Sequence, residues 1–280
     1  MSSKKITIQV NELIKSVPDG LSLGELRDQV KPSADVLVVN GFRSEATVYL
    51  KEGDQVVLIC QGETPRADEL EIFMIARHTP GVHKRMKKST VGIAGLGGLG
   101  SAISIALARM GIGTLILVDY DIVEPSNLNR QHFFIEHIGM AKTDAMAKIL
   151  ASVNPYIQVN THRVTLSKKN IAQLFQEADV IVECFDRAEA KVMIMEAVSQ
   201  FLPETYFVGA SGLAGYGDSN SIQTWRLGEK IFLVGDLVSA AEPGRGLMAP
   251  RVGIAAHHQA NLVVSLLMDP EKTMTQIPDI

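Results

Sequence analysis

The chain has 280 residues, 46% of them hydrophobic, and a formal net charge of −4, so it can bury one large and one small core but has no general basic surface for nucleic acid. No apolar run approaches the roughly 20 residues that span a bilayer, and the amino-terminal residues pass directly into a strand pattern, which predicts no membrane partner. The two cysteines cannot form a disulfide framework, so we expect a cytoplasmic protein.

Residues 1–62 carry the patterns of short strands around a single helix. Residues 6–10 alternate as a strand, and Ser22 with Glu25 forms a capping box at the start of a helix. Residues 36–39 read as a buried strand, the Asn40-Gly41 pair predicts a tight turn into a short strand, and residues 55–59 form the final strand. This order predicts a small α+β domain of the β-grasp, or ubiquitin-like, type.

Two segments of this domain, VVNGFR and EGDQVVLI, resemble the sulfur carrier protein ThiS. Carriers of that kind end in Gly-Gly, and their free carboxylate is the group that is activated. Here Gly62 is followed by Glu63 and the chain continues. The fused domain is therefore either a structural or regulatory element or, if the following segment is cleaved, a processed carrier.

A connecting segment, residues 63–88, leads to an apolar strand pattern and the spacing Gly95-x-Gly97-x-x-Gly100, with Gly98 inside it. Such a turn between a strand and a helix permits close approach of backbone N–H groups to phosphate, and the helix N-terminus adds partial positive charge. NAD, FAD, S-adenosylmethionine and ATP all use this arrangement. The glycines alone therefore predict a nucleotide site without naming the nucleotide.

The loop after the second strand is more polar than a dehydrogenase needs. Asp119 follows that strand about 20 residues after the glycines, where an acidic residue is expected to meet a ribose. Arg130 can bind phosphate oxygens bidentately and Lys142 can add a point charge, which suits a triphosphate. The polar positions predicted to bind nucleotide are Asp119, Asp121, Asn127, Asn129, Arg130, Gln131 and Lys142.

From about residue 90 to residue 267 the chain resembles the ThiF/MoeB/HesA family, the bacterial relatives of ubiquitin-activating enzymes. The motifs that carry the resemblance are GLGGLGS, DYDIVEPSNLNRQ, GMAK, IVECFD and GLMAPRVG. The resemblance implies an adenylyltransferase: the C-terminal carboxylate of a ubiquitin-like sulfur carrier attacks the α-phosphate of ATP, which gives an acyl adenylate and pyrophosphate. With its fused ThiS-like domain, the chain is similar to the family 2 variant of ThiF proteins, and a homodimer is implied.

The resemblance also assigns roles to residues. Asp119 corresponds to the ribose ligand, Arg130 and Lys142 to the phosphate ligands, and Asp186 to the carboxylate associated with magnesium. Arg77 corresponds less closely to an arginine that, in dimers of this family, extends from one subunit to the phosphates bound by the other. For Asp186 the alternative is a helix cap, and for the loop amides it is satisfaction of the loop backbone.

Many relatives hold a structural zinc with two Cys-x-x-Cys pairs and use a separate cysteine for thiol transfer. This sequence has neither pair, so we expect no zinc. Cys184 lies in the apolar strand pattern of residues 178–186, which favours a buried structural thiol over a nucleophile.

The remaining pattern predicts helices over residues 142–154, 171–175 and 188–201, strands at 157–159 and 206–208, and a hairpin formed by residues 221–227 and 230–234. With the nucleotide-binding segment this predicts a Rossmann-like, doubly wound, mostly parallel sheet with an antiparallel extension over residues 89–280. Residues 235–250 are poor in large apolar side chains, and in relatives the corresponding segment covers the carrier tail.

These patterns favour adenylation of the Gly-Gly tail of a sulfur carrier with ATP and magnesium, in thiamine biosynthesis. Two alternatives remain: a non-catalytic scaffold that binds nucleotide or a carrier, and an NAD-dependent oxidoreductase. The intact set of Asp119, Arg130, Lys142 and Asp186 argues against the scaffold, and the lack of a recognisable dehydrogenase acid–base pair argues against the oxidoreductase.

Overall fold

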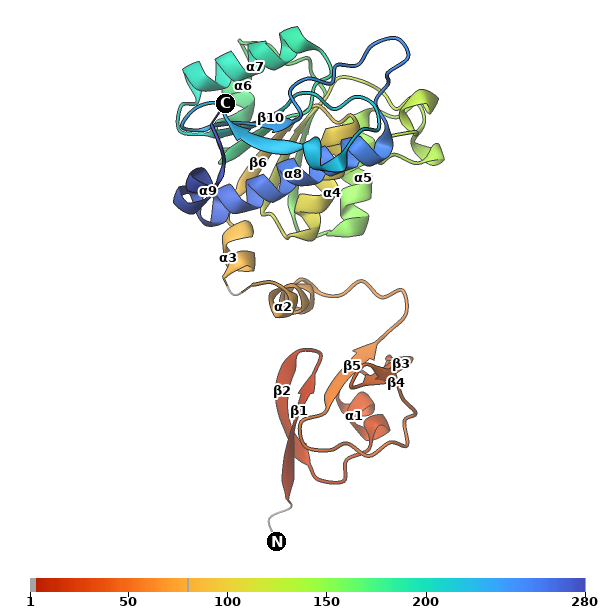
Figure 1. Cartoon of the computed structure of the whole chain (residues 1–280). Helices are drawn as coiled ribbons and strands as arrows, with labels where there is room; N and C mark the ends of the chain where they lie inside the picture. Colours follow the sequence, from red (N-terminus) through yellow and green to blue (C-terminus); the bar gives the residue numbers. More distant parts are fainter. Residues whose placement is uncertain (1–3, 80, 280) are drawn as a thin grey trace. The chain divides into compact units, whose positions relative to one another are not determined.

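The computed structural model describes residues 4–79 and 81–279, and the chain divides into two compact units, Met1–Pro80 and Gly81–Ile280 (Figure 1). The division lies inside the predicted connecting segment 63–88. One helix of that segment, α2 (Ala67–Arg77), belongs to the first unit, and the next, α3 (Val82–Met86), belongs to the second.

The first unit is a five-stranded sheet with one helix across it, as the β-grasp prediction expected. Its strands are β1 (Lys5–Val10), β2 (Leu13–Pro18), β3 (Val36–Val39), β4 (Phe42–Arg43) and β5 (Gln55–Ile59), in the order β2-β1-β5-β3-β4, and its helix is α1 (Leu23–Val30). The two central strands, β1 and β5, run parallel. Leu23 and Leu26 of α1 join Ile6 and Ile8 of β1 in one buried cluster. The predicted capping box is present, because the Ser22 and Glu25 side chains each accept the other's backbone N–H.

Strand β2 is an element of this unit that the sequence pattern did not predict. It pairs with β1 along its whole length, after a turn in which Asn11 and Glu12 both have positive φ angles, +45° and +67°. A turn of this hand usually contains glycine. Leu13 and Ile14 of β2 are 47% and 79% exposed, so this edge strand lacks the apolar alternation by which a strand is predicted.

The segment after β5 is tied back to the β-grasp fold. Asp35 accepts the backbone N–H of Gln61 at 3.0 Å, and the Glu63 carboxylate pairs with Lys31 at 2.8 Å. Glu63 also donates its backbone N–H to the Cys60 carbonyl. These contacts hold the segment that follows β5 against the domain.

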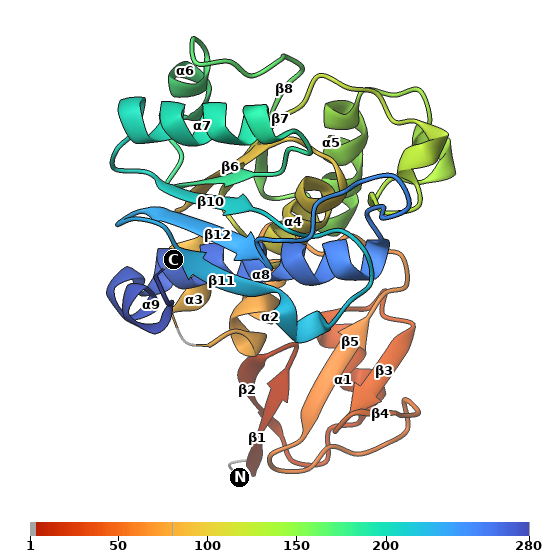
Figure 2. The ribbon, with the colours of Figure 1, turned by 45° about the horizontal axis from the view of Figure 1, so that its top comes forward.

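The second unit is a seven-stranded sheet in the order β11-β12-β10-β9-β6-β7-β8, with every neighbouring pair parallel except β11 and β12 (Figure 2). Its strands are β6 (Thr90–Ala94), β7 (Thr114–Val118), β8 (Gln158–His162), β9 (Val180–Glu183), β10 (Tyr206–Ala210), β11 (Gln223–Arg226) and β12 (Ile231–Gly235). Its longer helices are α4 (Gly98–Arg109), α5 (Lys142–Val153), α7 (Ala188–Phe201) and α8 (Ala249–Met268), and its shorter ones are α6 (Ile171–Phe175) and α9 (Pro270–Gln276). The predicted doubly wound sheet with an antiparallel extension is confirmed.

The helices cover both faces of this sheet. Helices α4, α5 and α8 pack on one face, and α6 and α7 pack on the other (Figures 1 and 2). All four residues of β9 are buried, as are Val91 to Ala94 of β6. The strand order reverses between β6 and β9, and open α/β sheets place ligands outside the carboxyl ends of strands at such a point. The fold therefore positions the turn after β6 and the turn after β9 side by side.

Candidate functional site

The glycine-rich turn joins β6 to α4 at the carboxyl edge of the sheet. Gly95 has a φ of +95°, and a Cβ there would lie 3.2 Å from the carbonyl oxygen of Cys184. A Cβ on Gly100 would lie only 1.9 Å from the Gly95 carbonyl oxygen, so the close packing of turn and helix requires glycine. Gly97 caps α4 and Gly98 is its first residue. A Cβ on Gly97 would meet only Gln131 within 4 Å, at 3.9 Å, which leaves this side of the helix N-terminus open.

Asp119, directly after β7, supports this turn. Its carboxylate is nearly buried and accepts the Leu96 N–H at 2.6 Å through Oδ2 and the Asp121 N–H at 2.8 Å through Oδ1. Each carboxylate oxygen can accept a further hydrogen bond. Asp119 thus links the second strand to the glycine-rich turn and keeps acceptor capacity for a hydroxyl.

Lys142 and Asp121 form an ion pair at the start of α5. The Lys142 Nζ lies 3.0 Å from Asp121 Oδ2, and the Lys142 backbone N–H donates to the Asp121 carbonyl at 3.0 Å. The lysine side chain is 8% exposed and the aspartate side chain 45% exposed. Asp121 is therefore the partner of the predicted phosphate-binding lysine and holds its ammonium group in place.

The loop amides divide between structural and open roles. Asn127 accepts the Glu124 N–H at 3.0 Å, which satisfies the backbone of the short 3₁₀ helix Pro125–Asn127. Asn129 accepts from the Arg130 guanidinium at 2.8 Å. Arg130 also lies against the start of α4, because its Cγ is 3.6 Å from where a Cβ of Gly98 would stand. The structure therefore brings Arg130 to the glycine-rich turn, and at Asn127 it shows the backbone role that was the alternative.

Gln131 has a buried polar atom with no partner among the described residues. The side chain is 8% exposed, and its Oε1 accepts no hydrogen bond there. Its Nε2 faces the open space at Gly97. A buried amide oxygen without a partner costs free energy unless a ligand or water satisfies it. Gln131 therefore fits a site that is completed by a bound polar molecule.

Asp186 lies in the turn between β9 and α7. It is exposed, and its carboxylate makes no hydrogen bond or ion pair within residues 4–79 and 81–279. The capping residue of α7 is Arg187, whose side chain makes no cap hydrogen bond. The alternative of Asp186 as the helix cap is therefore not what the structure shows. A magnesium ion bound by one carboxylate together with substrate phosphates matches this arrangement.

Cys184 is buried, with 8% of its surface exposed. Burial, reinforced by the nearby Glu183 carboxylate, raises the pKa of the Cys184 thiol well above its usual value. A thiol that stays protonated is a poor nucleophile, which supports its structural role. Among the described residues no group of three or more histidine, cysteine, aspartate or glutamate side chains could hold a metal ion. The expectation of no zinc stays a prediction.

Arg77 lies in the first unit, on α2. Its guanidinium pairs with the Glu12 carboxylate at 3.1 Å, and its side chain is 80% exposed. A role of Arg77 in phosphate binding therefore stays a prediction.

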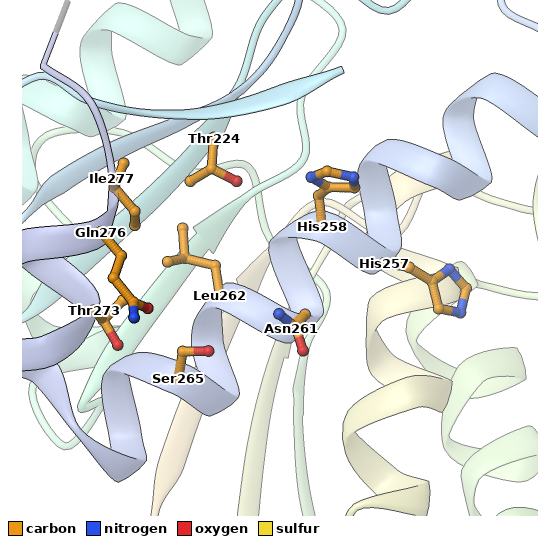
Figure 3. A pocket seen from close by; sticks show the side chains of 9 residues that line it. All are labelled: Thr224, His257, His258, Asn261, Leu262, Ser265, Thr273, Gln276 and Ile277. Carbon is orange, nitrogen blue, oxygen red and sulfur yellow. The ribbon is translucent and has the colours of Figure 1, made fainter. Parts of the chain in front are cut away.

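A hollow of about 400 Å³ lies elsewhere in the second unit, between α8, α9 and β11 (Figure 3). It is lined by Thr224, His257, His258, Asn261, Leu262, Ser265, Thr273, Gln276 and Ile277. None of these is a residue that the glycine-rich turn or the loop after β7 brings together. We therefore place the candidate site at the carboxyl ends of β6, β7 and β9 and not in this hollow.

Two ion pairs that each contain a buried member, at the ends of β9 and β12, were not predicted from the sequence. The Glu183 carboxylate, at the end of β9, lies 2.8 Å from Lys191 Nζ on α7. Asp236, after β12, lies 2.6 Å from the buried Arg251 guanidinium on α8. Burial alone would raise the pKa of Asp236, but hydrogen bonds from Ser239, from backbone N–H groups and from Arg251 lower it to about 2. The one sequence feature that could have indicated such a pair was a charged residue inside an apolar pattern.

Within the described residues, no helix combines the length and the apolar character that a bilayer crossing demands.

The chain is similar to known activating enzymes. Residues 71–276 match the ThiF family and residues 6–62 match the ThiS-like ubiquitin family. The adenylyltransferase and sulfurtransferase UBA4 of Candida glabrata is 37% identical over 147 residues, 51% of this chain and 34% of that protein. The ubiquitin-like modifier-activating enzyme 5 of Culex quinquefasciatus is 30% identical over 225 residues, 75% of this chain and 54% of that protein.

Among solved structures, the E. coli tRNA N6-threonylcarbamoyladenosine dehydratase TcdA in complex with AMP superposes with a TM-score of 0.64 at 19% identity, over 71% of this chain and 94% of that one. This similarity supports the fold. The chain covers less than two thirds of the length of the two sequence relatives above. The match to residues 71–276 covers more than half of the chain, and the chain therefore belongs to the ThiF family.

Proposed function

We propose that the chain is an adenylyltransferase that uses ATP and magnesium to activate the C-terminal Gly-Gly carboxylate of a ubiquitin-like sulfur carrier protein, in thiamine biosynthesis in the cytoplasm. One observation carries the proposal: Arg130 and Gln131, whose buried Oε1 has no partner among the described residues, lie beside the open N-terminus of α4. Asp119 links this turn to the loop in which Asp121 pairs with Lys142. Membership in the ThiF family and a second domain of the ThiS-like ubiquitin family support it.

In the proposed reaction a carboxylate oxygen of the carrier tail attacks the α-phosphorus of ATP. A new bond forms between that oxygen and phosphorus, the bond from phosphorus to the bridging oxygen breaks, and pyrophosphate leaves with the electron pair. Negative charge on the phosphates increases and shifts during this step. The N–H groups at the start of α4 and the cations of Arg130 and Lys142 supply the stabilisation.

The remaining residues position these groups. Asp119 holds the glycine-rich turn through Leu96 and offers an acceptor for the ribose hydroxyls. Asp121 pairs with the nearly buried Lys142 ammonium and holds it in place until phosphate oxygens share it. Magnesium, when bound, neutralises phosphate charge, and Asp186 is the carboxylate that would hold it.

We propose that the partner is a separate carrier and not the fused domain. Gly62 is followed by a peptide bond to Glu63, and a peptide carbonyl is not a nucleophilic carboxylate. The tie between Lys31 and Glu63 holds this segment against the fold. The fused domain then acts as a docking or regulatory element, and a homodimer is the proposed assembly.

The test is to incubate the full chain with purified Gly-Gly carriers, ATP and magnesium, and to measure the intact mass of each carrier. A mass gain of one AMP on a carrier, absent when its terminal glycine is deleted, supports the proposal. No gain on any carrier, together with tight ATP binding, would favour a scaffold. A melting temperature raised by NAD and not by ATP would favour an oxidoreductase.

A further inference from the structure

The Glu183 carboxylate connects three parts of the fold beside the candidate site. Its Oε1 accepts the Phe185 N–H at 2.6 Å and the Lys191 ammonium at 2.8 Å, and its Oε2 accepts the Ala210 N–H at 3.3 Å. Phe185 belongs to the turn after β9, Lys191 to α7, and Ala210 to the end of β10. One side chain thus ties two neighbouring strands to the helix that connects them.

This carboxylate is buried at a cost. The Glu183 side chain is 2% exposed, and the Lys191 side chain is 26% exposed. A buried ion pair of this kind is weak evidence for stability, since apolar side chains of similar volume often serve as well. Stability alone therefore does not explain the presence of this ion pair.

The turn that the pair fixes is the turn that presents Asp186. Before Asp186, the Phe185 N–H donates to the Glu183 carboxylate. After it, Lys191 in the first turn of α7 donates to the same carboxylate. Helix α7 has no side-chain cap that would otherwise fix its first turn. The Phe185 ring in turn lies against the glycine-rich turn, because one of its carbons is 3.2 Å from where a Cβ of Gly95 would stand.

We propose that Glu183 and Lys191 are positioning residues that set where the Asp186 carboxylate stands relative to the glycine-rich turn. The pair acts through Asp186 and has no contact with substrate in this scheme. The inference rests on the proposed magnesium role of Asp186. Removing a group that orients a metal-binding side chain typically lowers metal affinity by about tenfold or more.

The test measures ATP binding and not turnover. Isothermal titration gives the Kd for ATP in magnesium and in EDTA, and the ratio of the two reports how well magnesium is held. The main variant is Glu183→Gln with Lys191→Met, which removes both charges and leaves neither unpaired. We expect the ratio of the Kd in EDTA to the Kd in magnesium to be about tenfold lower for this double variant than for the wild type. Its Kd in EDTA should stay within about twofold of the wild-type value.

Three companion variants sharpen the result. Lys191→Arg keeps the charge and should keep the ratio. Glu196→Gln, also on α7, breaks an exposed ion pair with Lys168, which lies outside that helix, and should leave the ratio unchanged. Glu183→Gln alone leaves without a partner only the Lys191 ammonium, which is 26% exposed and can be reached by water, so it provides the same test if the double variant folds poorly.

The outcomes separate the inference from the function on which it rests. If Asp186→Asn lowers the ratio and the double variant keeps it, even at reduced thermal stability, the pair is merely structural and the inference is wrong. If Asp186→Asn keeps the wild-type ratio, the magnesium role fails and the inference fails with it.

Discussion

Replacing Lys142 by methionine tests the candidate site with little disturbance of the fold. Methionine keeps the apolar stem of the side chain and removes the ammonium group. The partner left behind, Asp121, is 45% exposed, so water can solvate its carboxylate once the ion pair is gone. An ion pair with one half-exposed member contributes about 1 kcal/mol or less, and we expect the free energy of unfolding to change by no more than this.

The effect on ATP binding should be larger. A hydrogen bond to a charged group is worth about 1.5–3 kcal/mol, and tenfold in a dissociation constant corresponds to about 1.4 kcal/mol. Loss of the Lys142 ammonium should therefore raise the Kd for ATP by about tenfold to a hundredfold. The nearly buried position of the group favours the upper part of this range, since water competes less for its hydrogen bonds.

The assay is isothermal titration with ATP and magnesium, together with urea unfolding of each protein. The matched control is Lys148→Met, which removes an exposed lysine from the same helix. If Lys142→Met binds ATP within about twofold of the Lys148→Met control, Lys142 does not contact the phosphates and the site is placed wrongly. A loss of several kcal/mol in unfolding would instead make Lys142 a structural residue.

Four further predictions follow from the same structure. Arg130→Ala should slow carrier-dependent ATP–pyrophosphate exchange by about a hundredfold, the scale of one lost preorganised donor, and near-normal exchange would contradict its role. Asp186→Asn should lose magnesium-dependent activity yet melt at the wild-type temperature, because its exposed carboxylate makes no contact among the described residues; unfolding would make it structural. The lowered pKa of Asp236, about 2 against 3.8, stabilises the fold by about 2 kcal/mol above pH 4, and this is lost as the pH falls toward 2. In urea titrations the stability difference between wild type and Asp236→Asn should therefore shrink between pH 5 and pH 3, and a constant difference would refute the linkage. Incubation of the intact chain with ATP and magnesium should leave its mass unchanged, whereas a stable gain of one AMP that maps to Gly62 after proteolysis would make the fused domain a genuine carrier.

Features of the fold that depend on local chemistry could be predicted from the amino-acid sequence. The glycine spacing specified the turn after β6, because only glycine tolerates the positive φ at Gly95 and the close approach at Gly100. The bounds of α7 followed from its periodic apolar residues and the stop near Pro203. The capping box of Ser22 and Glu25 marked the start of α1 in the same way. These signals act over a few residues, so they can be read without the fold.

Which polar side chains are paired and which are open depends on the three-dimensional fold. Asp121 and Lys142 are 21 residues apart, and Asp236 and Arg251 are 15 apart, so no local pattern joins them. Asn127 and Gln131 looked equivalent in the sequence, yet one satisfies a backbone N–H and the other keeps a buried oxygen without a partner among the described residues. Strand β2 was hidden for a related reason, since an exposed edge strand takes its stability from pairing with β1 and not from its own alternation. Burial and pairing depend on elements that the fold brings together from distant parts of the chain, which is why spacing along the sequence cannot reveal them.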